Sequence, residues 1–247
     1  MPGKPTKSWE PRTYRTRVAR PGLVAFQVAV RETDLLILAA RDLSSRAREV
    51  VVQERARLES YIQAHPDFLT SLTPWPEDPF APAVVREMVE AGRRAGVGPM
   101  AAVAGALAER VGRALLAESP EVIVENGGDL FVALTRPATI ALYAGSSPLS
   151  QRVGLRLAPE ETPVGVCTSS GTVGHSLSLG RADAACVLAA TAALADALAT
   201  ALGNRVQAPG DIDAALAWLA GIPGARGGVV VVGETLGAWG QVELAPL

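Results

Sequence analysis

The alternation of apolar and polar residues predicts many short strands and a smaller number of helices. Strands are expected where runs rich in Val, Leu and Ile stand between turn-forming residues. The expected strands cover residues 14–18, 23–30, 35–39, 122–124, 130–134, 139–143, 152–157, 164–168, 175–179, 183–190, 229–232 and 241–244. Hairpin turns are expected at 31–34, at 233–237 and at 125–129, where Asn-Gly favours two residues with positive φ.

Helical spacing of apolar residues predicts five helices, over residues 44–64, 83–94, 99–117, 191–202 and 211–219. Pro99 stands where the first position of a helix is expected, and Thr191 is a suitable N-cap with Gly203 just past the predicted end. Because regular alternation of strand and helix is missing, the pattern favours an α+β fold over a doubly wound parallel sheet.

Two segments have a different composition from the rest of the chain. Residues 1–12 contain three prolines and read as a flexible arm, which leaves residues 13–247 as a single domain. Residues 66–82 are rich in proline, and their rings Phe68, Trp75 and Phe80 are expected to anchor an ordered loop on the core.

The composition excludes several classes of function. The net charge of −2 offers no field to hold nucleic acid, and no apolar run is long enough to predict a membrane span, so we expect a cytoplasmic protein. The only lysines are Lys4 and Lys7, so a Schiff-base lysine in the body and a Walker-A lysine are both absent. The two cysteines do not form a CxxC pair, so no closed structural zinc site is expected, and both cysteines are expected to be reduced.

Asp196 and Thr200 are the first candidates for chemistry, because four residues of helix place them on the same face. A carboxylate and a hydroxyl in this relation can form half of a Mg²⁺ site that substrate phosphates complete. The alternative is an exposed Asp and a Thr bonded to its own helix.

Three glycine-containing segments could bind an anion. The loop at Thr168, Ser169, Ser170, Gly171 and Thr172 offers hydroxyls and backbone N–H groups, although turn formation alone could require the same residues. The turn at Asn126, Gly127, Gly128 and Asp129 leaves room for a ligand, although a plain hairpin explains it equally well. The helix entry at Gly98, Pro99 and Met100 leaves free N–H groups, although a buried helix against a sheet is an alternative.

Cys167 and His175 form the third candidate. If the two side chains meet across a short hairpin, the imidazole would lower the pKa of the thiol and create a nucleophile. The alternative is that Cys167, whose side chain should face away from Val164 and Val166, is a small core residue.

Several motifs together resemble a known superfamily. The segments ENGGD at 125–129, TSSG at 168–171 and ALADALATAL at 193–202 resemble, in order and spacing, the ApbE-type FAD:protein FMN transferases. The segments GVGPMAAVAGALAE, CTSSGTVGHSLSLGRADA, AWGQVEL and YIQAHPDFLTSL are similar to uncharacterised protein family 0280, the cytosolic relatives of these transferases, over nearly the whole chain.

The resemblance implies the ApbE-like fold, in which two intertwined α+β halves surround a central cleft. It implies that Asp196 and Thr200 help to hold Mg²⁺, and that the Asn126/Gly127/Gly128 turn and the Thr168–Gly171 loop line a cleft for FAD, FMN or a nucleotide. The expected partner is therefore a flavin or another phosphorylated small molecule.

The chain also departs from the transferase pattern. It has no lipoprotein signal, no Lys-Gly-Tyr segment and no His followed by Asp-Pro-x-Thr-Gly; residues 98–101 and 174–178 stand there instead, which argues against FMN transfer. Two alternatives stay open. One is a thiol-dependent enzyme or sulfur carrier using Cys167, since some relatives are linked to sulfide assimilation, and the other is a non-catalytic scaffold that forms a homodimer.

Overall fold

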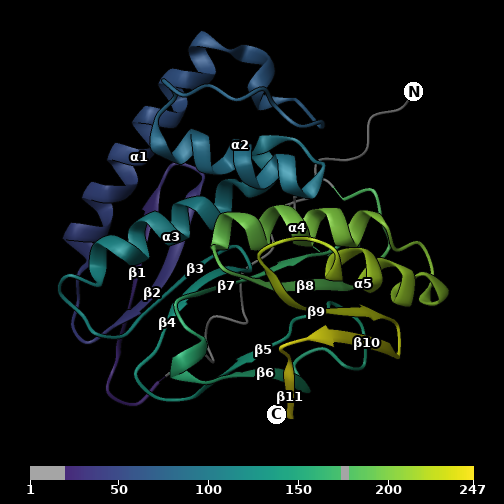
Figure 1. Cartoon of the computed structure of the whole chain (residues 1–247). Coiled ribbons are helices and arrows are strands. Elements are labelled where there is room, and N and C mark those ends of the chain that lie inside the picture. Colours follow the sequence, from purple (N-terminus) through teal and green to yellow (C-terminus); the bar gives the residue numbers. More distant parts are fainter. Residues whose placement is uncertain (1–19, 174–177) are drawn as a thin grey trace.

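The structure is a computed structural model that describes residues 20–173 and 178–247. The predicted arm, the predicted strand at 14–18 and His175 lie outside these ranges. The described elements form three layers, in which helices cover one face of a large sheet and a small sheet lies against its other face (Figure 1). Both sheets pair only antiparallel neighbours, so the α+β prediction is confirmed.

The large sheet has eight strands in the order β1-β2-β3-β4-β7-β8-β9-β10, and the small sheet has three in the order β11-β6-β5. The small sheet is made from a segment between β4 and β7 together with the last strand of the chain, so its two parts are distant in sequence. The strands are β1 (Val24–Val30), β2 (Thr33–Ala39), β3 (Val122–Asn126), β4 (Asp129–Ala133), β5 (Ala138–Ala141), β6 (Val153–Leu157), β7 (Val164–Ser169), β8 (Ala184–Ala189), β9 (Ala225–Val232), β10 (Thr235–Gly240) and β11 (Glu243–Pro246).

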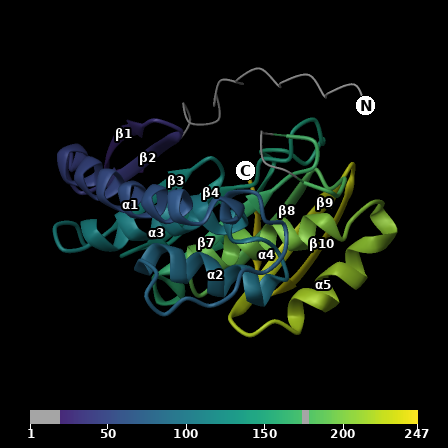
Figure 2. The ribbon, with the colours of Figure 1, turned by 90° about the horizontal axis from the view of Figure 1, so that it is seen from above.

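The helices lie together on one side of the large sheet, with α4 along the middle strands β7 and β8 (Figures 1 and 2). They are α1 (Ser44–Ala64), α2 (Ala83–Ala95), α3 (Val103–Leu115), α4 (Ala192–Asn204) and α5 (Ile212–Ala220), with short 3₁₀ turns η2 (Pro66–Leu69), η3 (Pro99–Ala102), η4 (Pro159–Glu161) and η5 (Pro209–Asp211). None of the helices in the described ranges is both long enough and apolar enough to span a membrane.

Two hydrophobic cores occupy the spaces between the layers. The helix-side core gathers residues such as Leu35, Ile37 and Leu198, and the inter-sheet core gathers residues such as Leu38 and Leu155. Successive strand residues point to opposite faces, so β2 supplies Leu35 and Ile37 to one core and Leu36 and Leu38 to the other. The inner strands of the large sheet, such as β2, β3 and β8, are therefore buried on both faces, which explains why they read as continuous apolar runs.

The predicted helices are all present, with bounds that differ by one to four residues at several ends. Pro99 opens the 3₁₀ turn η3, and the α-helix begins only at Val103. Gly203 was expected to follow the predicted helix 191–202, but it is buried inside α4, which continues to Asn204. The predicted N-cap is confirmed, since the Thr191 side chain accepts a hydrogen bond from the backbone N–H of Leu194.

The C-terminal hairpin was predicted with the wrong partner strand. A two-residue turn, in which Gly233 has a φ of 60°, sets the register, so β9 pairs with residues 235–240 instead of 241–244. Residues 241–244 lead instead into β11, which pairs with β6 in the small sheet. Of the strand predicted at 175–179, only Ser178 and Leu179 are described, and neither is in a strand.

The proline-rich segment 66–82 is ordered but keeps only part of its predicted anchoring. Phe68 is fully buried and meets Trp75 edge to face, with 5.5 Å between ring centroids. Phe80 was expected to be an anchor, but its side chain is 95% exposed, because Asp78 and Pro79 hold it in an outward turn.

Candidate functional site

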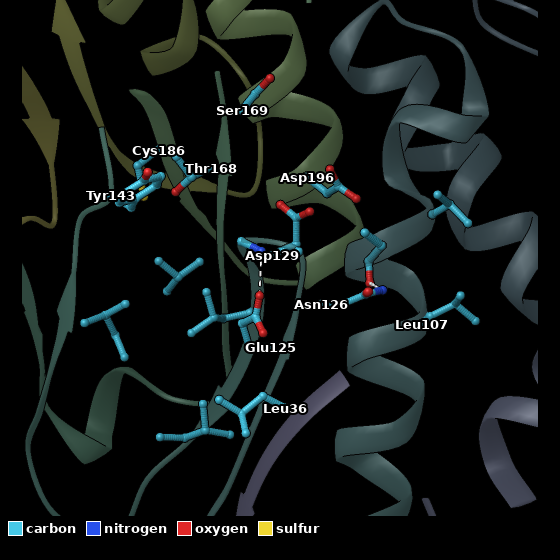
Figure 3. A pocket seen from close by; sticks show the side chains of 18 of the residues that line it. Leu36, Leu107, Glu125, Asn126, Asp129, Tyr143, Thr168, Ser169, Cys186 and Asp196 are labelled. Carbon is cyan, nitrogen blue, oxygen red and sulfur yellow. Dashed lines mark hydrogen bonds between the residues drawn. The ribbon is translucent and has the colours of Figure 1, made fainter. Parts of the chain in front are cut away.

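One large cavity of about 1670 Å³ lies where the two cores meet at the β3–β4 turn. Its walls come from both faces of the large sheet, since Leu107 belongs to the helix side whereas Ile123 and Val166 belong to the inter-sheet side. Figure 3 shows Asp129 and Asp196 near its centre, with Tyr143 and Cys186 toward one side and Leu107 toward the other. The cavity therefore has a polar centre between two apolar walls.

The β3–β4 turn is held in its shape by side chains on either side of it. The predicted hairpin is present, but its two positive-φ residues are Gly127 and Gly128, with φ values of 70° and 105°, instead of Asn126 and Gly127, because Asn126 still pairs with Asp129. The Glu125 carboxylate accepts a hydrogen bond of 2.8 Å from the Gly128 N–H, and the Asn126 amide donates to the Ala104 carbonyl at 3.1 Å. The turn is thus tied to the entry of α3.

Helix α4 contributes Asp196 and Thr200 to the same cavity. Asp196 is only 9% exposed and accepts a 2.9 Å hydrogen bond from the Gly105 N–H. Gly105 is required at this crossing, because a Cβ there would lie 2.2 Å from the Ala192 carbonyl oxygen. The small residues of α3 therefore let α4 approach closely enough for Asp196 to reach across.

The two aspartates form a pair with no basic partner within the described part of the chain. Burial raises the pKa of Asp196 to about 7, against hydrogen bonds from the Gly105 and Ala104 backbone that lower it. Burial, and then the charges of Asp196 and Glu125, hold the pKa of Asp129 well above its usual range. A cation or a proton would relieve the repulsion between these carboxylates.

The end of β7 supplies the hydroxyl groups of the site. Thr168, Ser169 and Ser170 all line the cavity and are partly exposed. Ser170 also accepts hydrogen bonds from the backbone N–H groups of Thr172 and Val173, at 3.1 and 2.9 Å, so it holds its own loop in shape.

Five of the predicted site residues that the structure describes do not line the cavity; they are Cys167, which is treated below, and Gly98, Pro99, Gly171 and Thr172. Gly98 and Pro99 pack under the loop that follows η2, where a Cβ on Gly98 would lie 1.8 Å from the Ser71 carbonyl oxygen. Gly171 allows an equally close approach to Gly180, and the Thr172 hydroxyl bonds to Asp183 at 3.0 Å. In this structure these residues serve packing and loop geometry, whereas the neighbouring Met100 does line the cavity.

Cys167 faces the helix side, opposite Val164 and Val166 as predicted, and is fully buried. Its thiol lies 3.4 Å from the Ala192 carbonyl oxygen. Burial and the charges of Asp129 and Asp196 raise the pKa of this thiol well above its usual range. This environment disfavours a thiolate, and the predicted partner His175 lies outside the described residues.

Two features of the cavity escaped sequence reasoning. Glu125 was seen only as part of a turn, although a carboxylate just before two glycines is well placed to accept the turn's N–H. The inter-sheet wall, with Leu36, Leu38, Leu130 and Leu155, carries no local signal, because it depends on how the small sheet is placed against the large one.

The donors at the polar centre fit Mg²⁺, which binds proteins through one or two carboxylates and completes its shell with water and phosphate oxygens. Asp129 and Asp196 offer two carboxylates and Thr200 offers a hydroxyl. Residues 20–173 and 178–247 contain no group of three His, Cys, Asp or Glu side chains able to hold a metal by themselves. The donor set therefore suits a metal shared with a ligand better than a metal enclosed by protein.

The chain is similar to several known proteins. A family model described as AbpE bacteria matches residues 15–218. A UPF0280 protein of Methanococcus aeolicus is 41% identical over 222 residues, covering 87% of this chain and 90% of that protein. Another UPF0280 protein, from Methanothermobacter thermautotrophicus, is 46% identical over 197 residues, covering 78% of this chain and 76% of that protein.

Two solved structures share the fold. The ApbE protein of Thermotoga maritima has a TM-score of 0.55 at 14% identity, covering 87% of this chain and 96% of that one. The apo form of the flavinyl transferase ApbE of Pseudomonas stutzeri has a TM-score of 0.53 at 18% identity, and the match covers 88% of this chain and 94% of that one. This chain belongs to the UPF0280 family and has the ApbE-like fold, with two α+β halves around a central cleft.

Proposed function

We propose that this protein binds a flavin or another phosphorylated small molecule together with Mg²⁺ in the cavity at the β3–β4 turn. The observation that carries the proposal is the Asp129/Asp196 pair, two carboxylates that face a large cavity without a basic partner among the described residues. Holding two like charges together in a buried place is costly unless a cation or a proton compensates them, and a bound Mg²⁺ would supply that positive charge.

Each part of the cavity has a role in this proposal. Asp129, Asp196 and Thr200 would hold the metal, which when bound supplies positive charge to phosphate oxygens. The hydroxyls of Thr168 and Ser169 would donate hydrogen bonds to the same oxygens. The apolar walls exclude water from the remainder of the ligand and suit a flat ring system.

Flavin is the preferred ligand class because the structural neighbours include flavin transferases. A shared fold alone is not evidence that this chain catalyses the same reaction as those transferases. Residues 98–101 replace a transferase segment, and Gly98 and Pro99 are packed against protein and so do not line the cavity. We therefore propose ligand binding in an ApbE-like cleft without FMN transfer.

Equilibrium binding tests the proposal, with FMN, FAD and ATP each titrated with and without Mg²⁺. We expect at least one of these ligands to bind in a Mg²⁺-dependent way, and Asp196→Ala to abolish that dependence. Thr200→Val should weaken Mg²⁺-dependent binding while leaving Tm unchanged, because the Thr200 hydroxyl has no described hydrogen bond within the protein. The matched control is Asp213→Ala, an exposed aspartate on α5 that does not line the cavity. Absence of binding by all three ligands under both conditions would remove the proposal.

A further inference from the structure

A second, smaller pocket of about 380 Å³ lies between helices α1, α2 and α3. These helices contact one another on the helical side of the large sheet (Figures 1 and 2). No residue lines both this pocket and the cavity at the β3–β4 turn, so the two spaces are separate. Three carboxylates and three guanidinium groups line the smaller pocket; they belong to Glu54, Glu87, Glu109, Arg46, Arg110 and Arg113.

Two of these charged side chains have an atom without a partner. Among the described residues, three buried side-chain nitrogen or oxygen atoms lack a hydrogen bond, and two of them, Glu54 Oε2 and Arg110 Nη2, belong to residues of this pocket. The Glu54 side chain is only 8% exposed, and its other oxygen binds Arg57, which does not line the pocket. Arg110 binds Glu87 through Nε at 3.1 Å. The pocket therefore contains one unsatisfied acceptor and one unsatisfied donor, both on charged groups.

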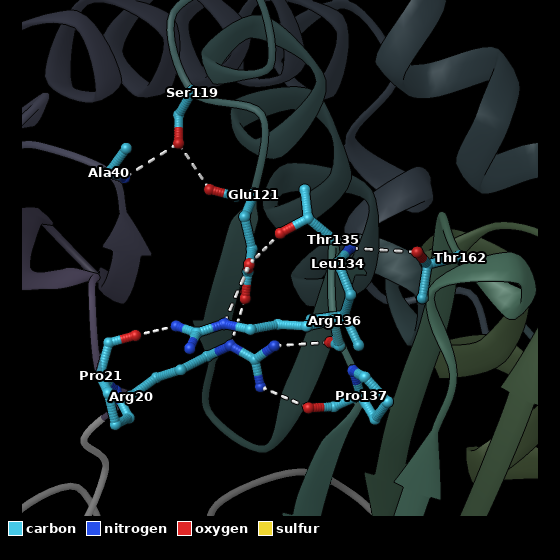
Figure 4. A network of polar contacts seen from close by, with 10 residues as sticks. All are labelled: Arg20, Pro21, Ala40, Ser119, Glu121, Leu134, Thr135, Arg136, Pro137 and Thr162. Carbon is cyan, nitrogen blue, oxygen red and sulfur yellow. Dashed lines mark hydrogen bonds and ion pairs between the residues drawn. The ribbon is translucent and has the colours of Figure 1, made fainter.

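The bare oxygen of Glu54 differs from what other buried carboxylates of this fold show. Figure 4 shows Glu121, which binds Arg20 through one oxygen and accepts a 2.6 Å hydrogen bond from the Thr135 hydroxyl through the other. Both oxygens of Glu109 are also bonded. Leaving a buried acceptor unsatisfied costs the free energy of removing it from water. The unsatisfied atoms in the pocket therefore point to a group from outside the chain.

The charges around the pocket favour a ligand that carries both signs. An anion alone would face three carboxylates, and a cation alone would face three guanidinium groups. Burial raises the pKa of Glu87, against the Arg110 guanidinium that lowers it, and the charges of Glu109 and Glu54 raise it further, so the three carboxylates lie near one another. Residues 20–173 and 178–247 nevertheless contain no acidic group of three arranged to hold a metal. An ammonium group would satisfy Glu54, and a carboxylate would satisfy Arg110.

The volume of the pocket suits a small organic molecule. Its 380 Å³ are more than ten times the roughly 30 Å³ that one water molecule occupies in the liquid, so a single bridging water would leave most of it empty. Ligand pockets in proteins range from roughly 300 to 1,000 Å³, and this one lies at the lower end of that range. A molecule of the size of an amino acid therefore fits.

We propose that the pocket between α1, α2 and α3 is a second binding site, which takes a small zwitterion such as an amino acid. The ammonium group of the ligand pairs with Glu54, and its carboxylate pairs with Arg110. This site does not depend on the proposed function, because the two spaces share no residue.

Calorimetric titration of the full chain without Mg²⁺ tests the proposal. The probes are glycine, β-alanine and 4-aminobutyrate, in which the two charges stand progressively farther apart, with acetate and methylamine as probes that carry a single charge. The pocket variants are Glu54→Gln and Arg110→Gln. The matched controls are Glu118→Gln and Arg41→Gln, which change an exposed ion pair that lines neither space. Tm is measured for every protein, and if Arg110→Gln unfolds because Glu87 loses its partner, Arg110→Gln combined with Glu87→Gln replaces it.

We expect at least one of the three zwitterions to bind the wild type, and to bind each pocket variant at least about tenfold more weakly, because each variant loses a charge-assisted hydrogen bond. Acetate and methylamine should bind the wild type more weakly than that zwitterion, and the controls should bind it as the wild type does. Absence of binding by all three zwitterions would overturn the proposal. Unchanged binding in either pocket variant, or single-charge probes that bind as tightly as the zwitterions, would overturn it as well. None of these results affects the proposed function, since the titrations contain neither flavin nor Mg²⁺.

Discussion

Replacing Asp196 by Asn tests whether the buried carboxylate pair weakens the fold at neutral pH. Asn can keep the hydrogen bond from the Gly105 N–H, since its side-chain carbonyl is also an acceptor. The substitution therefore removes the charge while keeping the shape and the contact. The difference in stability between this variant and the wild type, followed as a function of pH, then reports the titration of the buried carboxylates.

The size of the effect follows from the pKa of Asp196, which rises in the folded protein from its ordinary value of 3.8 to about 7. Because the folded state binds this proton more tightly, the stabilisation is fully present below pH 3.8 and is lost as the pH rises to 7. A difference of about three pKa units corresponds to about 4 kcal/mol at roughly 1.36 kcal/mol per unit. Because Asp129 titrates together with Asp196, we expect the free energy of unfolding of Asp196→Asn to exceed that of the wild type by about 2 to 4 kcal/mol at pH 8.

Urea unfolding at pH 4, 6 and 8 without Mg²⁺ measures this effect. At pH 4 the two proteins should be about equally stable, and at pH 8 Asp196→Asn should be the more stable one. Exposed Asp213→Asn is the matched control and should follow the wild type at each pH. The reasoning is refuted if Asp196→Asn is no more stable than the wild type at pH 8, or if its advantage is the same at pH 4.

Three further outcomes follow from the packing and the charges. Gly105→Ala should lower the free energy of unfolding by about 1 to 3 kcal/mol through overpacking against α4, whereas Gly210→Ala, where a Cβ meets nothing within 4 Å, should change it little in the same urea assay. Glu121→Ala should cost about 2 to 3 kcal/mol by leaving buried positive charge unpaired, whereas Glu118→Ala removes an exposed ion pair and should cost less than about 1 kcal/mol. Cys167 should resist iodoacetamide in the native protein at pH 8 and react in urea, and rapid native alkylation would restore the thiol hypothesis.

Local patterns were enough to predict most elements of the fold. The helix at 44–64 was predicted at its observed bounds, because its apolar spacing is regular and His65-Pro66 stops it. The β3–β4 hairpin was predictable from Asn126 and the two glycines after it, although the turn itself uses Gly127 and Gly128 instead of Asn126 and Gly127. Glycine led to a wrong prediction near the C-terminus, where Gly237 was interpreted as part of the turn at 233–237 although it lies within β10. Its role is to let α5 approach β10, since a Cβ there would lie 2.4 Å from Ile212.

The candidate site was predicted in its polar centre but not in its walls. Spacing along one helix places Asp196 and Thr200 on one face, and this relation needs no knowledge of the rest of the chain. The contact of Asp129 with Cys167 requires the register of β4 against β7, which are separated by the whole small-sheet segment. Such a register is set by the packing of both cores, so no local pattern in the sequence contains it.

The polar groups of the cavity also hold the helices to the sheet, and this limits how the site can vary. The Asn126 amide and the Asp196 carboxylate bond to the adjacent residues Ala104 and Gly105, so both sides of the cavity are fixed to one turn of α3. A buried carboxylate that is bonded to backbone yet lacks a counter-ion costs stability when it is charged, and this is the cost that a bound cation would offset in the proposed function. The inter-sheet wall has no comparable constraint, because apolar side chains of similar volume replace one another at small cost. We therefore infer that substitutions in the apolar walls can change the cavity with little loss of stability, whereas substitutions that remove the hydrogen bonds of Asn126 or Asp196 also disturb its attachment to α3.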